Sequence, residues 1–246
     1  MDKKIFPDDC IALDGRLDEA VWSEVPEYTG FTTIKTAGGE GVQGQVTGGE
    51  LVADQAFVKI LPCENRVYFG IKCMECNVPF AKTFAAKSVY TGNSVEIFLS
   101  PANSTSELYN FVLTVDGLKQ VIYFVEGGNN RQMYKPRWNH AVYFGEDYWS
   151  VEIEIPYTAL YYTPNATWSD KWLVNVVRNQ PIDKKFDTGY AKKQIFVCST
   201  LSMTDDFLKA ENFQHYSGMP IRPLKNDVRF FGVSLDLDEC VNDEYL

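Results

Sequence analysis

The segment SVYTGNSVEIFLSP, residues 88–101, is strand-like and places the charged side chain of Glu96 beside bulky apolar ones. Successive side chains of a strand point to opposite faces of its sheet, so Val95 and Ile97 share one face and Glu96 lies on the other. One face therefore suits a hydrophobic core, and the other presents a carboxylate. This combination is suited to a groove in a β-sandwich.

Further strand-like segments follow, and turn residues separate them. Asp116-Gly117, for example, supplies the positive φ values that a tight hairpin turn needs. A helix is predicted at residues 205–216, and a long glycine-rich loop at residues 36–53. Strands are predicted at residues 57–60, 66–73, 95–99, 109–115, 119–126, 141–144, 148–155, 172–178, 194–199 and 228–237.

The regular spacing of these strands, about ten residues apart, indicates a sandwich or a barrel. No linker-like change of composition interrupts the series. We therefore predict an all-β fold: a single antiparallel β-sandwich, jelly-roll or immunoglobulin-like, with short peripheral helices. One domain is expected to span residues 1–246.

The composition bounds the partners of this chain. Its 246 residues are 45% hydrophobic, which is typical of a globular protein rather than a disordered one. A formal net charge of −10 argues against nucleic acid and anionic membranes, because both require a basic surface. No apolar run is long enough to span a bilayer. The start, MDKKIFPDDC, has no apolar stretch before Pro7, so no signal peptide is expected.

The chain has six cysteines, at positions 10, 63, 73, 76, 198 and 240, and this number is sufficient for disulfides or a zinc site. Cys73 and Cys76 form a CxxC pair, with Cys63 upstream, but the second pair that zinc usually needs is absent. The cysteines lie in apolar strand patterns. We therefore predict buried, free and inert thiols, without stoichiometric zinc.

Motifs for catalysis are scarce. Only His140 and His215 are present, and neither GxSxG nor HExxH occurs. A GxGxxG run at residues 39–44 lacks the strand before it and the helix after it that nucleotide binding requires. Paired carboxylates, as in glycosidases, are the remaining option. Glu152 and Glu154 share a strand face, although alternating glutamates are more often the solvent-facing side of a surface strand.

Glu96 is the more informative carboxylate, because its sequence neighbours on both sides are apolar. A carboxylate at the rim of a sheet accepts hydrogen bonds from two adjacent sugar hydroxyls, while an aromatic ring covers the apolar face of the pyranose. Arg178, at the end of WLVNVVR, is a candidate for the opposite charge. Alternatively, Glu96 and Arg178 form a half-buried salt bridge that only connects two strands.

An ordered set of motifs resembles carbohydrate-binding module family 9 and its family-9-like relatives. The motifs are IALDGRLDEAVW, VYFGIKCMEC, SVEIFLSP, YNFVLTVDG, WNHA, YWSVEIEIPYTAL and WLVNVVR, between about residue 5 and about residue 200. The resemblance implies a β-sandwich module that binds sugars or glycan ends and is often attached to or encoded beside glycoside hydrolases. In this family, an aromatic clamp and polar side chains hold the sugar, and structural calcium occurs.

The resemblance implies four carbohydrate-binding residues: Tyr90, Glu96, Trp138 and Arg178. Glu96 matches the glutamate of the SVEIF strand, and Tyr90 lies just before it, where clamp-type members have tryptophan. Arg178 matches the arginine that closes the W-x-x-N-x-x-R strand, and Trp138 matches the aromatic residue ahead of the WSVEIEIP hairpin.

Two departures from the family pattern concern this site. Gly92-Asn93 stands where the family often has an acidic pair, which weakens the case for calcium or charged ligation there. After Gln194 the chain reads IFVCSTLS and lacks the tryptophan of a two-sided clamp.

The resulting hypothesis is a non-catalytic carbohydrate-binding module associated with polysaccharide breakdown, with no catalytic residue. No cofactor is expected apart from the calcium that the resemblance implies. The resemblance also implies a bacterial protein outside the cytoplasm. Two alternatives stay open: a glycoside hydrolase or accessory enzyme domain with paired carboxylates in one cleft, and a structural interaction module that has lost sugar binding.

Overall fold

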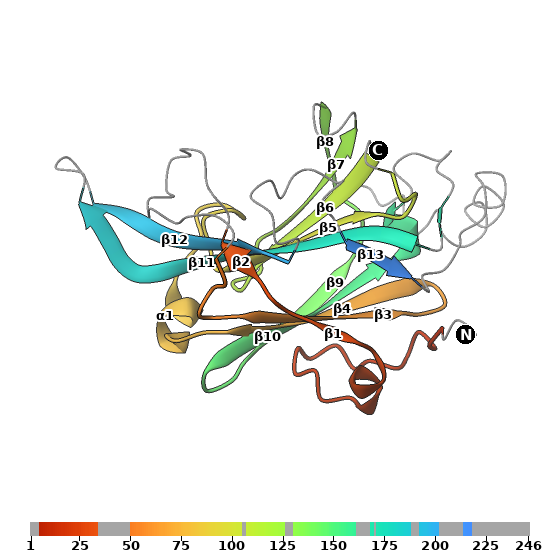
Figure 1. The fold of residues 1–246 in the computed structure, drawn as a ribbon, viewed down its shortest axis with the longest axis horizontal. Coiled ribbons are helices and arrows are strands. Elements are labelled where there is room, and N and C mark those ends of the chain that lie inside the picture. Colours follow the sequence, from red (N-terminus) through yellow and green to blue (C-terminus); the bar gives the residue numbers. More distant parts are fainter. Residues whose placement is uncertain are drawn as a thin grey trace.

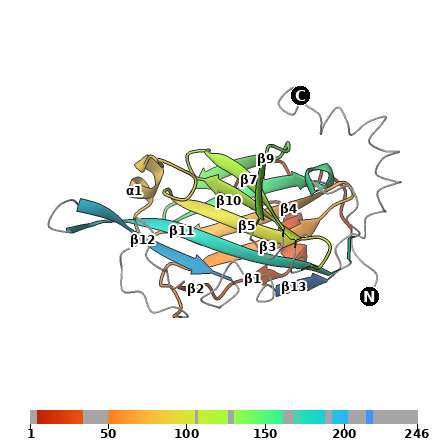
Figure 2. The same ribbon diagram turned by 90° about the horizontal axis from the view of Figure 1, so that it is seen from above.

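Two antiparallel β-sheets lie face to face as two layers in the computed structural model of this chain (Figures 1 and 2). The all-β sandwich predicted from the sequence is thereby confirmed. That one domain spans residues 1–246 stays a prediction. The structure describes residues 5–33, 50–104, 107–125, 130–160, 168–169, 171–187, 192–201 and 214–217.

The first layer is a five-stranded sheet with the order β1-β3-β4-β10-β9. Its strands are β1 (Glu27–Tyr28), β3 (Ala56–Pro62), β4 (Arg66–Met74), β9 (Asn139–Phe144) and β10 (Tyr148–Pro156). Short helices flank the strands: η1 (Ala20–Glu24), α1 (Val78–Thr83) and η3 (Tyr157–Leu160).

The second layer is an eight-stranded sheet with the order β2-β12-β11-β5-β6-β7-β8, and β13 pairs with β11. Its strands are β2 (Thr32–Thr33), β5 (Ser94–Ser100), β6 (Glu107–Thr114), β7 (Lys119–Val125), β8 (Asn130–Tyr134), β11 (Lys171–Asp187), β12 (Lys192–Thr200) and β13 (Gln214–Ser217).

The core between the two layers follows from the period-two alternation. Ile97 and Leu99 of β5 are completely buried there, as are Phe69 and Ile71 of β4 in the facing sheet. Phe98 belongs to a separate buried cluster on the outer face of the eight-stranded sheet. The two faces predicted for residues 95–99 are therefore confirmed.

The turn residues correctly located the hairpins. Asp116-Gly117 connects β6 to β7, and Gly117 has a φ of 91°, a left-handed value that glycine adopts without a Cβ clash. The strands predicted at 57–60 and 66–73, and at 141–144 and 148–155, also pair as antiparallel neighbours, β3 with β4 and β9 with β10. These predictions depended on local chemistry alone, which explains their success.

Helix prediction was less accurate. The α1 helix was missed, although Asn77 caps its first turn by accepting from the Phe80 amide at 3.1 Å, and Pro79 lies in that turn. Of the helix predicted at 205–216, the described residues 214–216 belong instead to strand β13 (Gln214–Ser217), whose backbone pairs with β11. The rest of that helix, most of the loop at 36–53 and the strand at 228–237 lie outside the described residues.

The N-terminal motif IALDGRLDEAVW covers the outer face of the five-stranded sheet. Trp22, in η1, is 1% exposed and lies against Gly70 of β4. A Cβ at Gly70 would lie 2.7 Å from a methyl group of Leu17 and 3.0 Å from the indole of Trp22. Glycine is therefore required at position 70, because any side chain would displace the segment that packs there.

A buried carboxylate fixes this segment. One oxygen of Glu152 accepts from the backbone N–H groups of Asp14 at 2.9 Å and Gly15 at 2.8 Å. Its other oxygen accepts from the indole N–H of Trp22 at 3.0 Å. Gly15 has a φ of 85°, and a Cβ there would lie 2.8 Å from backbone atoms of β9. The Asp-Gly turn thus brings two amides to one carboxylate.

The solvent-facing interpretation of Glu152 and Glu154 is wrong. Glu152 is completely buried and Glu154 is 8% exposed. Glu154 forms a salt bridge with Arg66 and accepts from the side-chain amide of Asn139 at 3.2 Å. The alternation was recognised, but the sequence does not show that the N-terminal segment covers this face.

Replacing Glu152 with Gln should lower the free energy of unfolding by about 1.5–3 kcal/mol. The reason is that one carboxylate oxygen becomes an NH₂ group, and this donor would face the backbone or indole N–H groups that now donate to the carboxylate. Urea denaturation measures this difference. The matched control is Glu146→Gln in the exposed β9–β10 turn, which should stay within about 0.5 kcal/mol. Equal stabilities for the two variants would contradict the role assigned to Glu152.

Candidate functional site

A row of side chains crosses the outer face of the eight-stranded sheet. Glu96 of β5 is paired with Val177 of β11 and with Val112 of β6, and Val112 is paired with Gln120 of β7. Directly paired residues point to the same face of a sheet. Gln120 therefore lies on the same face as Glu96, two strands away or about 10 Å.

Two carboxamides bind the Glu96 carboxylate. Asn110 of β6 donates to one oxygen at 3.1 Å, and Asn179 of β11 donates to the other at 2.8 Å. Glu96 and Asn179 are 5% and 6% exposed, so this polar cluster forms a nearly closed base. Burial raises the pKa of Glu96, and the two amide hydrogen bonds oppose that shift.

One acceptor of this cluster has no hydrogen bond. Asn110 donates its amide to Glu96, and its own oxygen has no partner among the atoms that the structure describes. A buried polar atom without a partner is uncommon in folded proteins and often marks a place where a ligand or water binds.

Tyr90 provides the accessible rim of this cluster. Its side chain is 43% exposed, and its hydroxyl accepts from the Gln120 amide at 2.9 Å. Because Gln120 is in the same row as Glu96, the tyrosine ring is attached to the side of the sheet that carries the carboxylate. Of the four residues predicted from sequence, the structure places Tyr90 and Glu96 on one face.

Trp138 lies elsewhere, in the core between the two sheets. It is 3% exposed and contacts Phe111 edge to face, with 5.5 Å between ring centroids. The Lys119 ammonium lies 4.9 Å from a ring centroid of Trp138 and donates to its carbonyl at 2.9 Å. These contacts give Trp138 a packing role.

Arg178 also lies apart from Glu96, because it is paired with Val95 and therefore points to the opposite face of the sheet. Its guanidinium donates to the carboxylate of Glu75 at 3.3 Å and to the carbonyl of Asp54 at 2.9 Å. The structure therefore contains a buried salt bridge, but Glu75 replaces Glu96 as the partner of Arg178.

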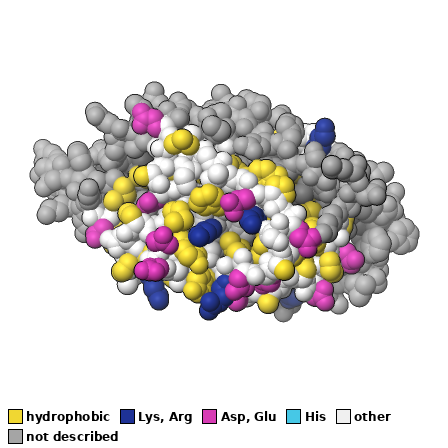
Figure 3. Space-filling view, turned by 60° about the horizontal axis from the view of Figure 1, so that its bottom comes forward, with side chains coloured by type: hydrophobic (Ala, Val, Ile, Leu, Met, Phe, Trp, Pro, Cys, Tyr) yellow, Lys and Arg dark blue, Asp and Glu magenta, His cyan; other side chains and the backbone are white. Residues whose placement is uncertain are grey.

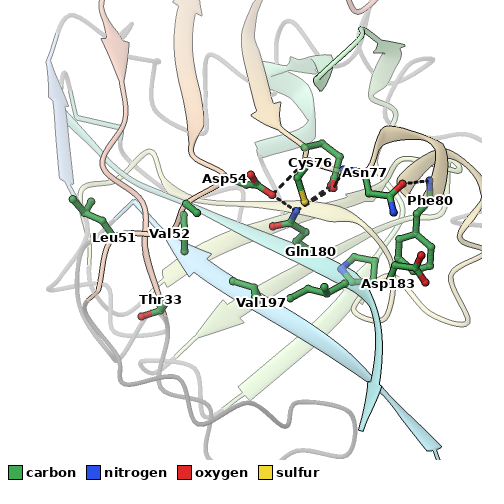
Figure 4. Close-up of a pocket in the computed structure, with 14 residues that line it drawn as sticks. Thr33, Leu51, Val52, Asp54, Cys76, Asn77, Phe80, Gln180, Asp183 and Val197 are labelled. Carbon is green, nitrogen blue, oxygen red and sulfur yellow. Dashed lines mark hydrogen bonds between the residues drawn. The ribbon is translucent and has the colours of Figure 1, made fainter.

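A separate pocket of about 620 Å³ opens beside this salt bridge (Figure 4). Asp54 accepts there from the Gln180 amide at 2.8 Å, and Phe80 of α1 and Val197 of β12 contribute apolar walls. None of the four residues predicted from sequence lines this pocket.

The pocket contains one cluster of metal-ligating groups, Asp54, Glu75 and Cys76, within the part of the chain that the structure describes. Calcium takes six to eight oxygen ligands. Here a thiol replaces one oxygen, and both carboxylates already accept from Gln180 while Glu75 also pairs with Arg178. This cluster therefore does not fit calcium.

The cysteines follow the predicted pattern only in part. Cys63 and Cys73 are buried, Cys10 and Cys198 are half-buried, and Cys76 is exposed. The five described cysteines are all free thiols, and Cys240 lies outside the described residues. Cys76 departs from expectation because it follows the end of β4 rather than lying within a strand.

Known structures share this architecture. A family 9 carbohydrate-binding module from Caldicellulosiruptor kristjanssonii in complex with cellotriose matches with a TM-score of 0.54. The two sequences are 14% identical over 89% of this chain and 93% of that chain. The chain has the fold of a family 9 carbohydrate-binding module.

A protein from Bacteroides uniformis described as carbohydrate-binding also matches the fold of this chain, with a TM-score of 0.55. It is 12% identical, over 87% of this chain and 96% of that chain. No family model and no curated protein sequence matches this chain.

Sequence reasoning missed three residues of the outer-face cluster: Asn110, Gln120 and Asn179. Asn110 lies within YNFVL and is an amide inside an apolar strand, whereas Asn179 lies between the polar residues Arg178 and Gln180. An isolated amide in an apolar strand is a usable signal, because it needs a buried partner. Gln120 has no comparable signal in its sequence neighbourhood.

The stability contribution of Glu96 should depend on pH. Since its folded-state pKa lies above the ordinary value of 4.5, the folded state binds more protons between these two values. The quantity to compare is the unfolding free energy of the unmodified protein minus that of Glu96→Gln. This difference should fall as the pH rises from 4.5 through the raised pKa, and it should stay constant at higher pH. Urea denaturation across this range tests the sign, and a difference that grows with pH would contradict it.

Replacing Arg178 with Met should cost about 3–5 kcal/mol of stability, because Glu75 would stay buried without its cation. Adding Glu75→Gln to this variant should recover part of the loss, giving non-additive values in a double-mutant cycle. Arg137→Met, at an exposed position, is the control and should change stability by less than about 0.5 kcal/mol. Additive effects at positions 75 and 178 would show that the pair is not coupled.

Proposed function

We propose that this chain is a non-catalytic carbohydrate-binding module with its sugar site on the outer face of the eight-stranded sheet. The observation that carries the proposal is an exposed aromatic ring, Tyr90, hydrogen-bonded to Gln120 on the sheet face that also carries a carboxylate and amides. The proposed site consists of Tyr90, Gln120, Glu96, Asn110 and Asn179. Trp138 and Arg178 are excluded from it because they point into the interior.

The chemistry of these groups suits a sugar. A pyranose has an apolar face, which stacks on an aromatic ring, and a periphery of hydroxyls, which need both donors and acceptors. Tyr90 supplies the ring, and Gln120 supplies an amide with two N–H donors, of which one binds the tyrosine hydroxyl. Glu96 and the unpaired oxygen of Asn110 supply acceptors.

The likeness to known structures supports the choice of ligand class. The family 9 module of the same fold was solved with cellotriose, a β-linked glucose oligomer. Cello-oligosaccharides are therefore the first ligands to test, followed by a wider glycan array. A single ring in place of a two-sided clamp favours weaker binding than a clamp gives, because only one face of the sugar is covered.

The carboxylates support a binding role over the glycosidase alternative. Both oxygens of Glu152 accept protein hydrogen bonds, and Glu154 pairs with Arg66, so these two carboxylates already have structural partners. A glycosidase requires two carboxyl groups facing one cleft. In the pocket, Asp54 and Glu75 both accept from the Gln180 amide, and Glu75 also pairs with Arg178, so these two carboxylates have structural partners as well. We propose no metal in the sugar site, and the Asp54 cluster does not fit calcium.

The surface charge supports a neutral ligand. The net charge is −10, and Lys and Arg side chains lie among Asp and Glu on the face of the molecule in Figure 3. A mixed surface of this kind lacks the basic field that a polyanion needs. Within the described residues, no helix combines the length and hydrophobicity required to cross a membrane.

Calorimetric titration tests the proposal with cello-oligosaccharides and any array hit. Tyr90→Ala and Glu96→Gln should each weaken binding ten- to a hundredfold, or roughly 1.5–3 kcal/mol, because stacking or charged hydrogen bonds are lost. Tyr90→Phe should retain more affinity than Tyr90→Ala, since the ring remains.

The matched control is Leu51→Ala. Leu51 is 69% exposed and pairs with β2, five strands away from β7 in the sheet order. This variant should bind like the unmodified protein. If Tyr90→Ala and Glu96→Gln also bind like it, the sugar site lies elsewhere. If no glycan binds the unmodified chain, the structural-module alternative replaces the proposal.

A further inference from the structure

Two cysteines that are far apart in the sequence lie side by side at the edge of the five-stranded sheet. The sulfur atoms of Cys10 and Cys63 are 3.7 Å apart, although the two residues are separated by 53 positions along the chain. Cys63 is completely buried at the end of β3, whereas Cys10 is half-buried in the segment before the Asp14-Gly15 turn. Their proximity therefore arises from tertiary structure.

Backbone and side-chain hydrogen bonds hold the two segments together without help from sulfur. The Phe6 amide donates to the Pro62 carbonyl at 3.1 Å, and the Glu64 amide donates to the Phe6 carbonyl at 3.1 Å. The Asp8 carboxylate accepts from the backbone and side-chain amides of Asn65 at 2.9 and 2.8 Å. The folded chain therefore maintains a high local concentration of one thiol at the other.

The remaining gap can close by movement of Cys10. A disulfide has a sulfur–sulfur distance of about 2.05 Å, so the sulfurs must approach by less than 2 Å, or about one rotamer adjustment. Cys63 is fixed, because its amide donates to Arg66 at 2.8 Å and its carbonyl accepts from Tyr157 at 2.9 Å. Cys10 lies outside the helices and strands of the fold, so its side chain has more freedom.

A metal site does not account for this pair. Zinc needs four ligands, and a structural site uses cysteine and histidine. Within the part of the chain that the structure describes, the one group of three metal-ligating residues is Asp54, Glu75 and Cys76, which does not include Cys10 or Cys63. Two thiols without further ligands can instead react with each other.

We propose that Cys10 and Cys63 are a disulfide-forming pair that links the N-terminal segment covalently to β3 when the chain meets a low-molecular-weight disulfide. The accessible Cys10 thiolate attacks one sulfur of the reagent RSSR, forming a mixed disulfide and releasing one RS⁻. The Cys63 thiolate then attacks the Cys10 sulfur and releases the second RS⁻. The two protein thiols are oxidised, the reagent is reduced to two RSH, and the two thiol protons balance the thiolates released. This proposal does not depend on sugar binding.

The surroundings of the pair make the reaction slow at neutral pH. Burial raises the pKa of Cys10, with smaller increases from Asp9 and Asp8. Burial also raises the pKa of Cys63, the neighbouring Cys10 and Asp8 add to it, and Arg66 opposes the shift. Since the thiolate is the nucleophile, the oxidation rate should rise about tenfold per pH unit below these pKa values.

The test uses the reduced full chain treated with oxidised glutathione, blocked with iodoacetamide and digested with trypsin without reduction. Cleavage after Lys4, Arg16, Lys59 and Arg66 places Cys10 in peptide 5–16 and Cys63 in peptide 60–66, each with a single cysteine. Mass spectrometry should find these two peptides joined, at a rate that increases with pH. Dithiothreitol should separate them.

Thermal unfolding supplies the second readout. A cross-link that closes a loop of this length should raise Tm by roughly 8 to 16 °C, and dithiothreitol should abolish the increase. Cys10→Ser should lose both the linked peptides and the Tm increase. The matched control, Cys76→Ser, removes an exposed thiol and should retain both.

Three results would overturn the proposal. The first is a stable glutathione adduct on Cys10 without a link to Cys63. The second is an equal yield of links that join other cysteine-containing peptides. The third is an unchanged Tm in the linked protein, or the same Tm increase in Cys10→Ser.

Discussion

Three buried carboxylates organise this sandwich, because a carboxylate removed from water must receive hydrogen-bond donors from the protein. Glu152 receives two backbone amides and an indole, Glu96 receives two carboxamides, and Glu75 receives a guanidinium and further amides. Each donor set includes a residue at least 83 positions away along the chain. The need to satisfy each carboxylate therefore fixes the N-terminal segment, the strands around β5 and the edge beside α1.

Side chains alternate between the two faces of each strand, so adjacent residues have different roles. One points into the interior, and the next points to the outer face of the sheet. Arg178 points into the interior and pairs with Glu75, whereas Asn179 points outward and binds Glu96. The same separation operates in β5, where Ile97 packs between the sheets and Glu96 faces out. A single change of register would exchange these roles, so the core and the proposed site constrain each other.

Much of the fold was predictable from the sequence, because hairpins and strand faces depend on local patterns such as Asp116-Gly117. The site was predictable only in part. Tyr90 and Glu96 share a face, but Arg178 does not join them, since β-strand register and the choice between Glu75 and Glu96 as partner are tertiary properties. The burial of Glu152 was unpredictable for the same reason: Asp14, in the segment that covers it, lies 138 positions away along the chain.

The placement of the tryptophans determines what optical spectroscopy can detect. All five of them, Trp22, Trp138, Trp149, Trp168 and Trp172, are at most 3% exposed. The exposed ring of the proposed site is a tyrosine, so a ligand that stacks on it would contact no indole. Intrinsic tryptophan emission should therefore report loss of packing during unfolding and stay almost silent in a sugar titration. A tryptophan introduced at position 90 would convert the same chain into a fluorescent sensor of its own ligand.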